Sequence, residues 1–159
     1  MIAGITGHQK IGTPQTINWV REQLLRLLVA ESVTEGWTSL AMGADQLFAS
    51  LLSQQGLPYN VVLPCRQYEA TFSESDRHIF FSFLSKASSV VTLNFDKPSE
   101  VAYLDAGKEV VSRSETLIAV WDGLPAKGLG GTADVVHFAR ERLKRVLHVD
   151  TSTHVVSLI

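Results

Sequence analysis

The chain has 159 residues, of which 45% are hydrophobic and 19% charged, a composition that excludes a disordered protein and suits a domain with a sizeable core. Its net charge of −2 offers no electrostatic footprint for nucleic acid, so nucleic acid is not an expected partner. Cys65 is the only cysteine, which excludes an internal disulfide and a zinc site built from cysteines. We expect a single domain over 1–159 with no signal peptide and no membrane span, hence a cytoplasmic protein without a membrane partner.

Strand-like and helix-like segments alternate along the chain. Short apolar runs predict strands at 2–6, 37–41, 60–63, 88–93, 117–121 and 145–149, with a short edge strand at 155–159. Apolar residues at helical spacing predict a first helix from Pro14, N-capped by Thr13, to near Gly36. Further helices are expected at 45–54, 67–86, 100–112 and 133–143.

This alternation is typical of parallel βαβ units. It predicts an α/β fold, a single Rossmann-like three-layer α/β/α domain with a mainly parallel sheet of about six or seven strands. Ligands of such sheets bind at the carboxyl ends of the strands. We therefore expect one cleft formed by the loops after strands one, two, four and five, at 7–13, 42–45, 94–99 and 122–132.

The segment from 116 to 132 is the most informative part of the sequence. A buried strand is followed by a glycine-bearing loop with Gly128, Gly130 and Gly131, and then by a helix after Thr132. Glycines let the backbone approach an anion closely, and the helix dipole adds a partial positive charge. A side chain at Gly130 or Gly131 would occupy the space that a phosphate needs. The segment predicts a site for a phosphorylated or carboxylated ligand.

Four motifs in this order resemble the SLOG superfamily of Rossmann-like proteins, above all its YpsA-like and DUF2493-like members. They are Ile5-Thr6-Gly7-His8-Gln9, Met42-Gly43-Ala44-Asp45-Gln46-Leu47, the run from Val111 to Gly123, and Gly130-Gly131-Thr132-Ala133. More distant relatives are the LOG phosphoribohydrolases, the DNA-processing protein DprA and the molybdenum cofactor carrier proteins. The resemblance implies a pocket for a nucleotide or nucleotide-like ligand, with no certain cofactor and no shared reaction.

The motifs and the predicted strand ends together give one set of candidate ligand-binding residues: Thr6, Gly7, His8, Gly43, Ala44, Asp45, Asp122, Gly123, Gly130, Gly131 and Thr132. Simpler interpretations stay open. The glycines can serve as plain turns, and Thr132 as the N-cap of the last helix. Asp45 can interact with a helix dipole, Asp122 can form a turn before Gly123 instead of binding a ribose hydroxyl, and His8 can be solvated.

The sequence departs from the LOG phosphoribohydrolases at one position. When Gly131-Thr132 is laid on the glycine-threonine pair of their motif, their catalytic glutamate falls on Val135. Asp134 is one residue earlier, turned about 100° around a helix, and cannot replace it. The resemblance therefore does not extend to LOG chemistry.

Two function classes remain after this comparison. The first is a domain that binds or senses a nucleotide without turning it over. The second is an enzyme that acts at the N-glycosidic bond or phosphate, with acid–base work by Asp45, Glu74, Glu115 or Asp122. No nucleophile–base pair has a readable spacing, so the sequence favours binding and predicts no catalytic residue. A cavity carboxylate with a strongly raised pKa would favour the enzyme.

Two further expectations concern other ligands and partners. The histidines have no metal-like spacing, so no metal site is predicted. The helix around 68–83 carries more phenylalanine than one packed face needs. We expect a homo-oligomer, a dimer that buries Phe80, Phe81 or Phe83.

Overall fold

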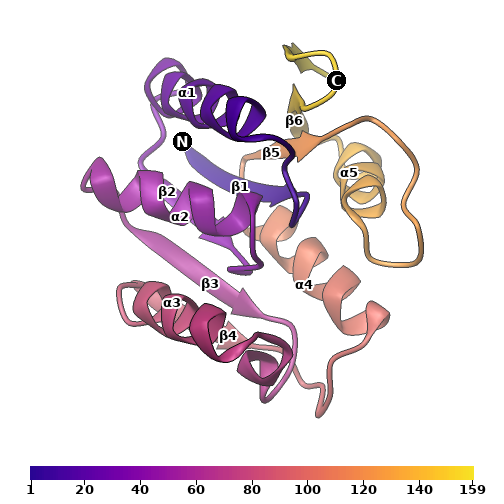
Figure 1. Ribbon diagram of the computed structural model, residues 1–159. Helices are drawn as coiled ribbons and strands as arrows, with labels where there is room; N and C mark the ends of the chain where they lie inside the picture. Colours follow the sequence, from indigo (N-terminus) through magenta and orange to yellow (C-terminus); the bar gives the residue numbers. More distant parts are fainter.

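The computed structural model describes residues 1–159 and has three layers, with helices on both faces of one sheet (Figure 1). The strands are β1 (Ile2–Gly7), β2 (Glu35–Thr38), β3 (Tyr59–Leu63), β4 (Ser89–Thr92), β5 (Thr116–Trp121), β6 (Arg145–Asp150) and β7 (Val155–Leu158). The helices are α1 (Pro14–Ala30), α2 (Ala44–Gln54), α3 (Glu74–Leu84), α4 (Glu100–Arg113) and α5 (Thr132–Glu141), with a 3₁₀ turn at Tyr68–Thr71. None of these helices combines the length and apolar character needed to cross a membrane.

The seven strands lie in the order β4-β3-β2-β1-β5-β6-β7, and all neighbours are parallel except β6 and β7. Helices α1, α2 and α3 cover one face, and α4 and α5 cover the other. The predicted α/β class, three-layer architecture and mainly parallel sheet are confirmed. The chain moves outward from β1 to β4 and then crosses back to β5. The strand order therefore reverses between β1 and β5, and folds of this kind bind ligands at that point.

Local sequence explains the elements that hold the cavity. Helix α1 buries Val20, Leu24 and Leu28 at helical spacing, and its N-cap Thr13 accepts a hydrogen bond from the Thr16 N–H. Strand β5 is buried on both faces from Thr116 to Val120, as expected for a central parallel strand. These two elements fix the ends of β1 and β5 against a packed core.

Two predicted elements have different boundaries in the structure. The second strand runs over Glu35–Thr38, not 37–41, because Leu40 has φ of 54° and the chain turns there toward α2. The predicted helix at 67–86 is divided into the 3₁₀ turn and α3. The division occurs because the Ser73 side chain accepts from the Asp76 N–H and starts a new helix there.

The predicted arrangement of strand ends was wrong for strand four. Strand β4 is the outer strand of the sheet, two places from β2, so the loop at 94–99 lies away from β1 and β5. Strand β3 lies next to β2 and sends Pro64 and Tyr68 toward the ends of the central strands. The cleft is formed by the loops after β1, β2, β3 and β5.

Candidate functional site

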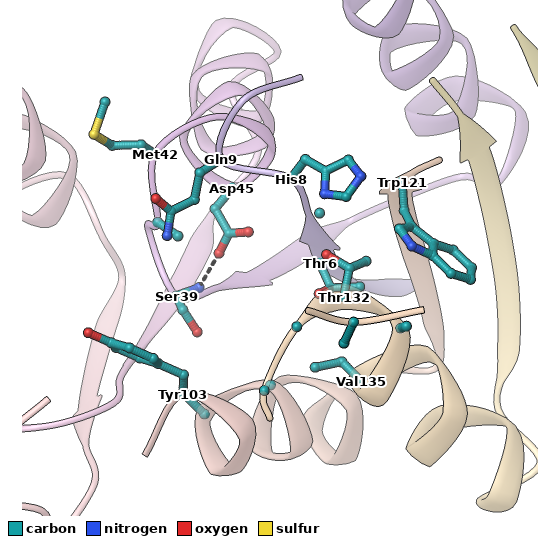
Figure 2. Close-up of a pocket in the computed structure, with 18 of the residues that line it drawn as sticks. Thr6, His8, Gln9, Ser39, Met42, Asp45, Tyr103, Trp121, Thr132 and Val135 are labelled. Carbon is teal, nitrogen blue, oxygen red and sulfur yellow. Dashed lines mark hydrogen bonds between the residues drawn. The ribbon is translucent and has the colours of Figure 1, made fainter. Parts of the chain in front are cut away.

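A cavity of about 570 Å³ lies at the carboxyl ends of β1, β2, β3 and β5, a volume within the usual range for small-molecule sites. Helix α4 forms one wall through Tyr103, Ala106 and Gly107, and the loop before α5 forms another. In Figure 2, His8, Trp121 and Thr132 lie at one end of the cavity, and Ser39, Met42 and Tyr103 at the other. We call these the α5 end and the α4/β2 end.

Backbone N–H groups at the start of α5 form part of the α5 end. Gly131 is the N-cap, and the Thr132 and Ala133 N–H groups donate to no protein atom, as is usual in a first helical turn. The Gly130 N–H is already occupied, because it donates to Asp134 Oδ2 at 2.8 Å. Two N–H groups and the Thr132 hydroxyl are therefore open to a ligand, and Gly130 contributes none.

Two expectations about this loop need correction. Thr132 is the first residue of α5 and not its cap, because the extended backbone of Gly131 already precedes the helix. Gly131 has φ of −74°, which any residue adopts, and an added Cβ would meet Ala126 Cβ at 2.8 Å instead of filling ligand space. Gly128 and Gly130 do need a glycine conformation, with φ of 133° and 88°, and a Cβ at Gly130 would meet the carbonyl of Glu100.

His8 and Asp122 lie in contact across the ends of β1 and β5. His8 Nε2 lies 3.2 Å from Asp122 Oδ1, and that oxygen also accepts from the Leu124 N–H at 3.0 Å. Burial alone raises the pKa of Asp122, but the Leu124 N–H and His8 lower it by more, so the net pKa is below its usual value. Both side chains line the cavity, and Asp122 already has partners for one oxygen.

Asp45 is the most deeply buried carboxylate of the cavity, with a 5% exposed side chain at the start of α2. Its Oδ2 accepts from the Ser39 N–H at 2.8 Å and the Thr38 hydroxyl at 3.0 Å. The Ala41 N–H also stabilises the carboxylate, but only the bonds to Oδ2 have good hydrogen-bond geometry. No fully buried side-chain oxygen or nitrogen of the chain is left unpaired, so Oδ1 opens to the cavity (Figure 2). Burial raises the pKa of Asp45 to about 6, although the bonds from Ser39 and Thr38 oppose the rise.

Tyr68 brings a second unpaired polar group. Its side chain is 6% exposed and lines the cavity, and its ring contacts Phe72, Phe80 and Tyr103 at edge-to-face angles. The hydroxyl has no hydrogen-bond partner in the protein and, by the same reasoning as for Asp45, reaches the cavity. Burial raises the pKa of Tyr68, and the Asp45 charge raises it further, so the phenol remains protonated and can donate.

The structure brings eight of the predicted candidate residues to the cavity: Thr6, Gly7, His8, Asp45, Asp122, Gly130, Gly131 and Thr132. Gly43, Ala44 and Gly123 do not line it. Gly43 has φ of 81°, and a Cβ there would collide with the carbonyls of His8 and Gln9, so it lets the first two loops pack together. Ala44 strengthens this contact, because its N–H donates to the His8 carbonyl at 3.2 Å.

Sequence reasoning missed several lining residues: Gln9, Ser39, Phe72, Tyr103 and Trp121. From the sequence, Tyr68 could reach a base or phosphate from the helix around 68–83, but a solvated helical face was the preferred interpretation. The signal that could have found Tyr68 and Phe72 is the strand order, since they follow β3, which ends beside the cavity. Val135 also lines the cavity, packed beside Gly107, so the position of the LOG glutamate faces the cavity and carries no carboxylate. No group of three or more His, Cys, Asp or Glu side chains is arranged to hold a metal ion.

Solved structures share this architecture. DNA processing protein A (DprA) from Streptococcus pneumoniae matches with a TM-score of 0.69 at 15% identity, over 92% of this chain and 49% of that chain. The molybdenum cofactor binding protein from Rippkaea orientalis matches with a TM-score of 0.60 at 19% identity, over 92% of this chain and 74% of that chain. These likenesses show a shared fold, which is also that of the proteins named for the predicted resemblance. The finer resemblance to YpsA-like and DUF2493-like members stays a prediction.

No protein-family model matches the sequence, and no curated protein matches it significantly. DprA from Helicobacter pylori, described for its single-stranded DNA binding mode, matches with a TM-score of 0.65 at 15% identity, over 93% of this chain and 64% of that chain. The chain thus spans about half to two thirds of the length of these two DprA proteins.

The exclusion of nucleic acid as a partner was wrong. Two of the matching structures are DprA proteins, and one is described by its binding of single-stranded DNA. The exclusion rested on the net charge of −2, which sums over the whole surface. Net charge does not report the charge of one face or one cavity, so it cannot exclude a partner that contacts only that part.

Proposed function

We propose that this protein binds a nucleotide or a nucleotide-derived phosphorylated ligand in the cavity at the carboxyl ends of β1, β2, β3 and β5. The phosphate binds at the α5 end and the heterocycle at the α4/β2 end. The observation that carries the proposal is the pairing, within one cavity, of unpaired N–H groups at a helix N-terminus with a wall of aromatic side chains.

The α5 end has the chemistry that an anion requires. The Thr132 and Ala133 N–H groups have no protein acceptor, and the helix dipole adds a partial positive charge at the same point. His8 and Lys127 are the only basic side chains that line the cavity, and His8 is adjacent to the carboxylate of Asp122. With so few cations, backbone groups supply most of the attraction for a phosphate.

The α4/β2 end has the chemistry that a planar heterocycle requires. Tyr68, Phe72 and Tyr103 line it, and Tyr103 remains 38% exposed at the wall formed by α4. A base that stacks on an aromatic ring of a protein gains roughly 1–3 kcal/mol. The fold shared with a molybdenum cofactor binding protein supports a small-molecule ligand.

The test compares a nucleotide with its nucleoside. A thermal-shift screen of 5′-nucleotides comes first, because a ligand at 100 times its Kd adds about 2.7 kcal/mol of apparent stability. Calorimetry then measures the best nucleotide and its nucleoside against wild type and Gly131→Val, whose side chain would displace the loop through Ala126. The nucleotide should bind wild type more tightly than the nucleoside, and Gly131→Val should remove that difference. Equal affinities for nucleotide and nucleoside in wild type would exclude the phosphate site.

The DprA comparisons favour a second candidate, single-stranded DNA. Fluorescence anisotropy with a labelled oligodeoxynucleotide at 50 mM and 200 mM salt tests it, because phosphate contacts make affinity salt-dependent. Salt-dependent binding that a free nucleotide competes away would indicate that the cavity holds one nucleotide of the strand. Binding that no mononucleotide affects would indicate a separate surface.

Asp45 favours an enzyme as a third candidate, because it is the cavity carboxylate with a raised pKa that such chemistry would use. Incubation of the purified protein with the nucleotide, followed by chromatography, detects a released base or phosphate. A product that forms with wild type and not with Asp45→Asn would support turnover. An unchanged nucleotide would leave the binding proposal as it stands.

A further inference from the structure

Two polar atoms that face the cavity make no hydrogen bond that stabilises the fold. Asp45 Oδ1 and the Tyr68 hydroxyl both belong to side chains that are more than nine-tenths buried, and neither has a hydrogen-bond partner of good geometry in the protein. Because both atoms open to the cavity, solvent can pair them in the free protein. A ligand that displaces this solvent must offer partners of its own, since a buried polar group without a partner costs roughly 1–3 kcal/mol.

The two atoms have opposite hydrogen-bonding roles. An ionised Asp45 can only accept, whereas the protonated Tyr68 phenol can donate. Both side chains line the same cavity. A ligand that satisfies both must present one donor and one acceptor. The vicinal hydroxyls of a ribose do so, because one hydroxyl can donate while its neighbour accepts.

The position of Asp45 agrees with a sugar site. It lies at the start of α2, just past β2, between the free N–H groups of α5 and the aromatic wall with Tyr103 (Figure 2). In a nucleotide the sugar likewise lies between the phosphate and the base. Asp122, the residue first expected to bind a ribose hydroxyl, also has partners at one oxygen only, but its side chain is 32% exposed, whereas Asp45 is 5% exposed.

We propose that Asp45 and Tyr68 form a ribose-recognition pair, in which Asp45 accepts a hydrogen bond from one of the 2′ and 3′ hydroxyls and Tyr68 donates to the other. This inference rests on the proposed function, because it assigns the sugar of a ligand whose phosphate lies at α5. It goes further by making the site selective for ribonucleotides over nucleotides that lack both hydroxyls.

The geometry of the pair depends on interactions already present. The Ser39 N–H and the Thr38 hydroxyl hold Oδ2 and so fix the carboxylate plane, which leaves Oδ1 directed at the cavity. The Tyr68 ring is fixed by its edge-to-face contacts with Phe72 and Phe80. Neither side chain therefore has to be ordered when a ligand arrives, which favours affinity.

The test measures calorimetric affinities of AMP, GMP, CMP and UMP and of their 2′,3′-dideoxy forms for wild type, Asp45→Asn and Tyr68→Phe. A hydrogen bond to a charged group corresponds to a loss of roughly 10- to 100-fold in affinity when it is removed. The dideoxy form of the best-binding nucleotide should bind wild type weaker by that factor. In Asp45→Asn the ribonucleotide should weaken to the level of its dideoxy form, and Tyr68→Phe should show a smaller loss in the same direction.

Two matched controls separate recognition from folding and charge. Tyr59→Phe removes a buried tyrosine hydroxyl that bonds the Phe83 carbonyl away from the cavity, and Asp105→Asn removes a carboxylate on the outer surface of α4. Both should keep the wild-type preference for ribose. The ligand series on wild type needs no variant, so a variant that failed to fold would not remove the test.

The outcomes distinguish the two levels of the proposal. If ribose and dideoxy forms bind wild type equally, or if Asp45→Asn keeps the preference, the recognition pair is wrong and nucleotide binding still stands. If none of the four nucleotides binds wild type, the proposed function fails and the recognition pair fails with it.

Discussion

At the scale of single residues, burial of the Asp45 carboxylate lowers the stability of the fold at neutral pH, because burial disfavours the charged form. Its folded pKa of about 6 exceeds the ordinary value of 3.8, so the native state holds the proton more tightly than the unfolded chain. The resulting stabilisation is complete below pH 3.8 and is lost as the pH rises through 6.

We therefore predict that Asp45→Asn stabilises the ligand-free protein at neutral pH. The amide can still accept from Ser39 and Thr38 and carries no charge, so about 3 kcal/mol of pH-dependent destabilisation should disappear. Urea unfolding at pH 4, 5, 6 and 7 measures this. The difference between wild type and variant should grow from pH 4 to pH 7. Parallel pH profiles for the two proteins would contradict the assignment.

A second residue-scale prediction separates ligand contact from helix capping at Thr132. Because Gly131 is the N-cap of α5, Thr132→Ala should change the free energy of unfolding by less than about 0.5 kcal/mol and still weaken nucleotide binding. Ser99→Ala is the matched comparison. The Ser99 side chain caps α4 by accepting from the Ala102 N–H, so its loss should cost about 1 kcal/mol. A large destabilisation by Thr132→Ala would show that it caps the helix after all.

At the scale of elements, the cavity depends on how closely the loops after β1 and β2 approach. Gly43→Ala should cost about 1–3 kcal/mol, because φ of 81° is unfavourable for alanine and the methyl group would meet the carbonyls of His8 and Gln9. Gly56→Ala is the control. Its φ of 68° is also positive, but nothing lies within 4 Å of the added atom. Equal losses in urea unfolding would show that loop packing contributes nothing at Gly43.

The sequence predicted the type and order of the elements well, because periodic apolar residues decide both. It predicted less well the helix boundaries and hydrogen bonds that single side chains determine. The helix at 67–86 divides because Ser73 caps a new helix, and the Gly130 N–H is occupied because Asp134 turns back to it. Ser73 followed by Asp76 is a recognised signal for a helix start and could have been read, whereas the bond from the Gly130 N–H to Asp134 has no comparable signal. The sequence likewise identified Asp45 as a candidate, but it could not show that only one of its two oxygens is bonded by Ser39 and Thr38.

At the scale of the whole molecule, the strand order decided which loops form the cavity. Short-range patterns cannot show that β3 lies beside β2 and β4 at the edge, and the loop after β4 was chosen wrongly for that reason. The glycine pattern also misled at Gly43 and Gly123, which lie outside the cavity. The residues at the ends of β1 and β5 were found because a glycine-bearing loop follows each of these strands in the sequence.

The expected homodimer is a prediction at this scale, and the structure restricts which residues can form it. Phe80 is 1% exposed and belongs to the core, whereas Phe81 is 45% exposed and Ile79 is 49% exposed on α3. We predict a dimer that buries Phe81 and becomes a monomer in Phe81→Ser. Sedimentation velocity at micromolar concentration measures both species. A wild-type monomer under these conditions would contradict the prediction.

The central claim is that a nucleotide phosphate binds at the start of α5 in this cavity. The most direct test follows the backbone amide resonances of the ¹⁵N-labelled protein while the best nucleotide from the screen is added. We predict that the largest shifts occur at Thr132 and Ala133, with further shifts at His8 and Asp45. Shifts confined to residues outside the cavity, or no shifts at saturating nucleotide, would contradict it.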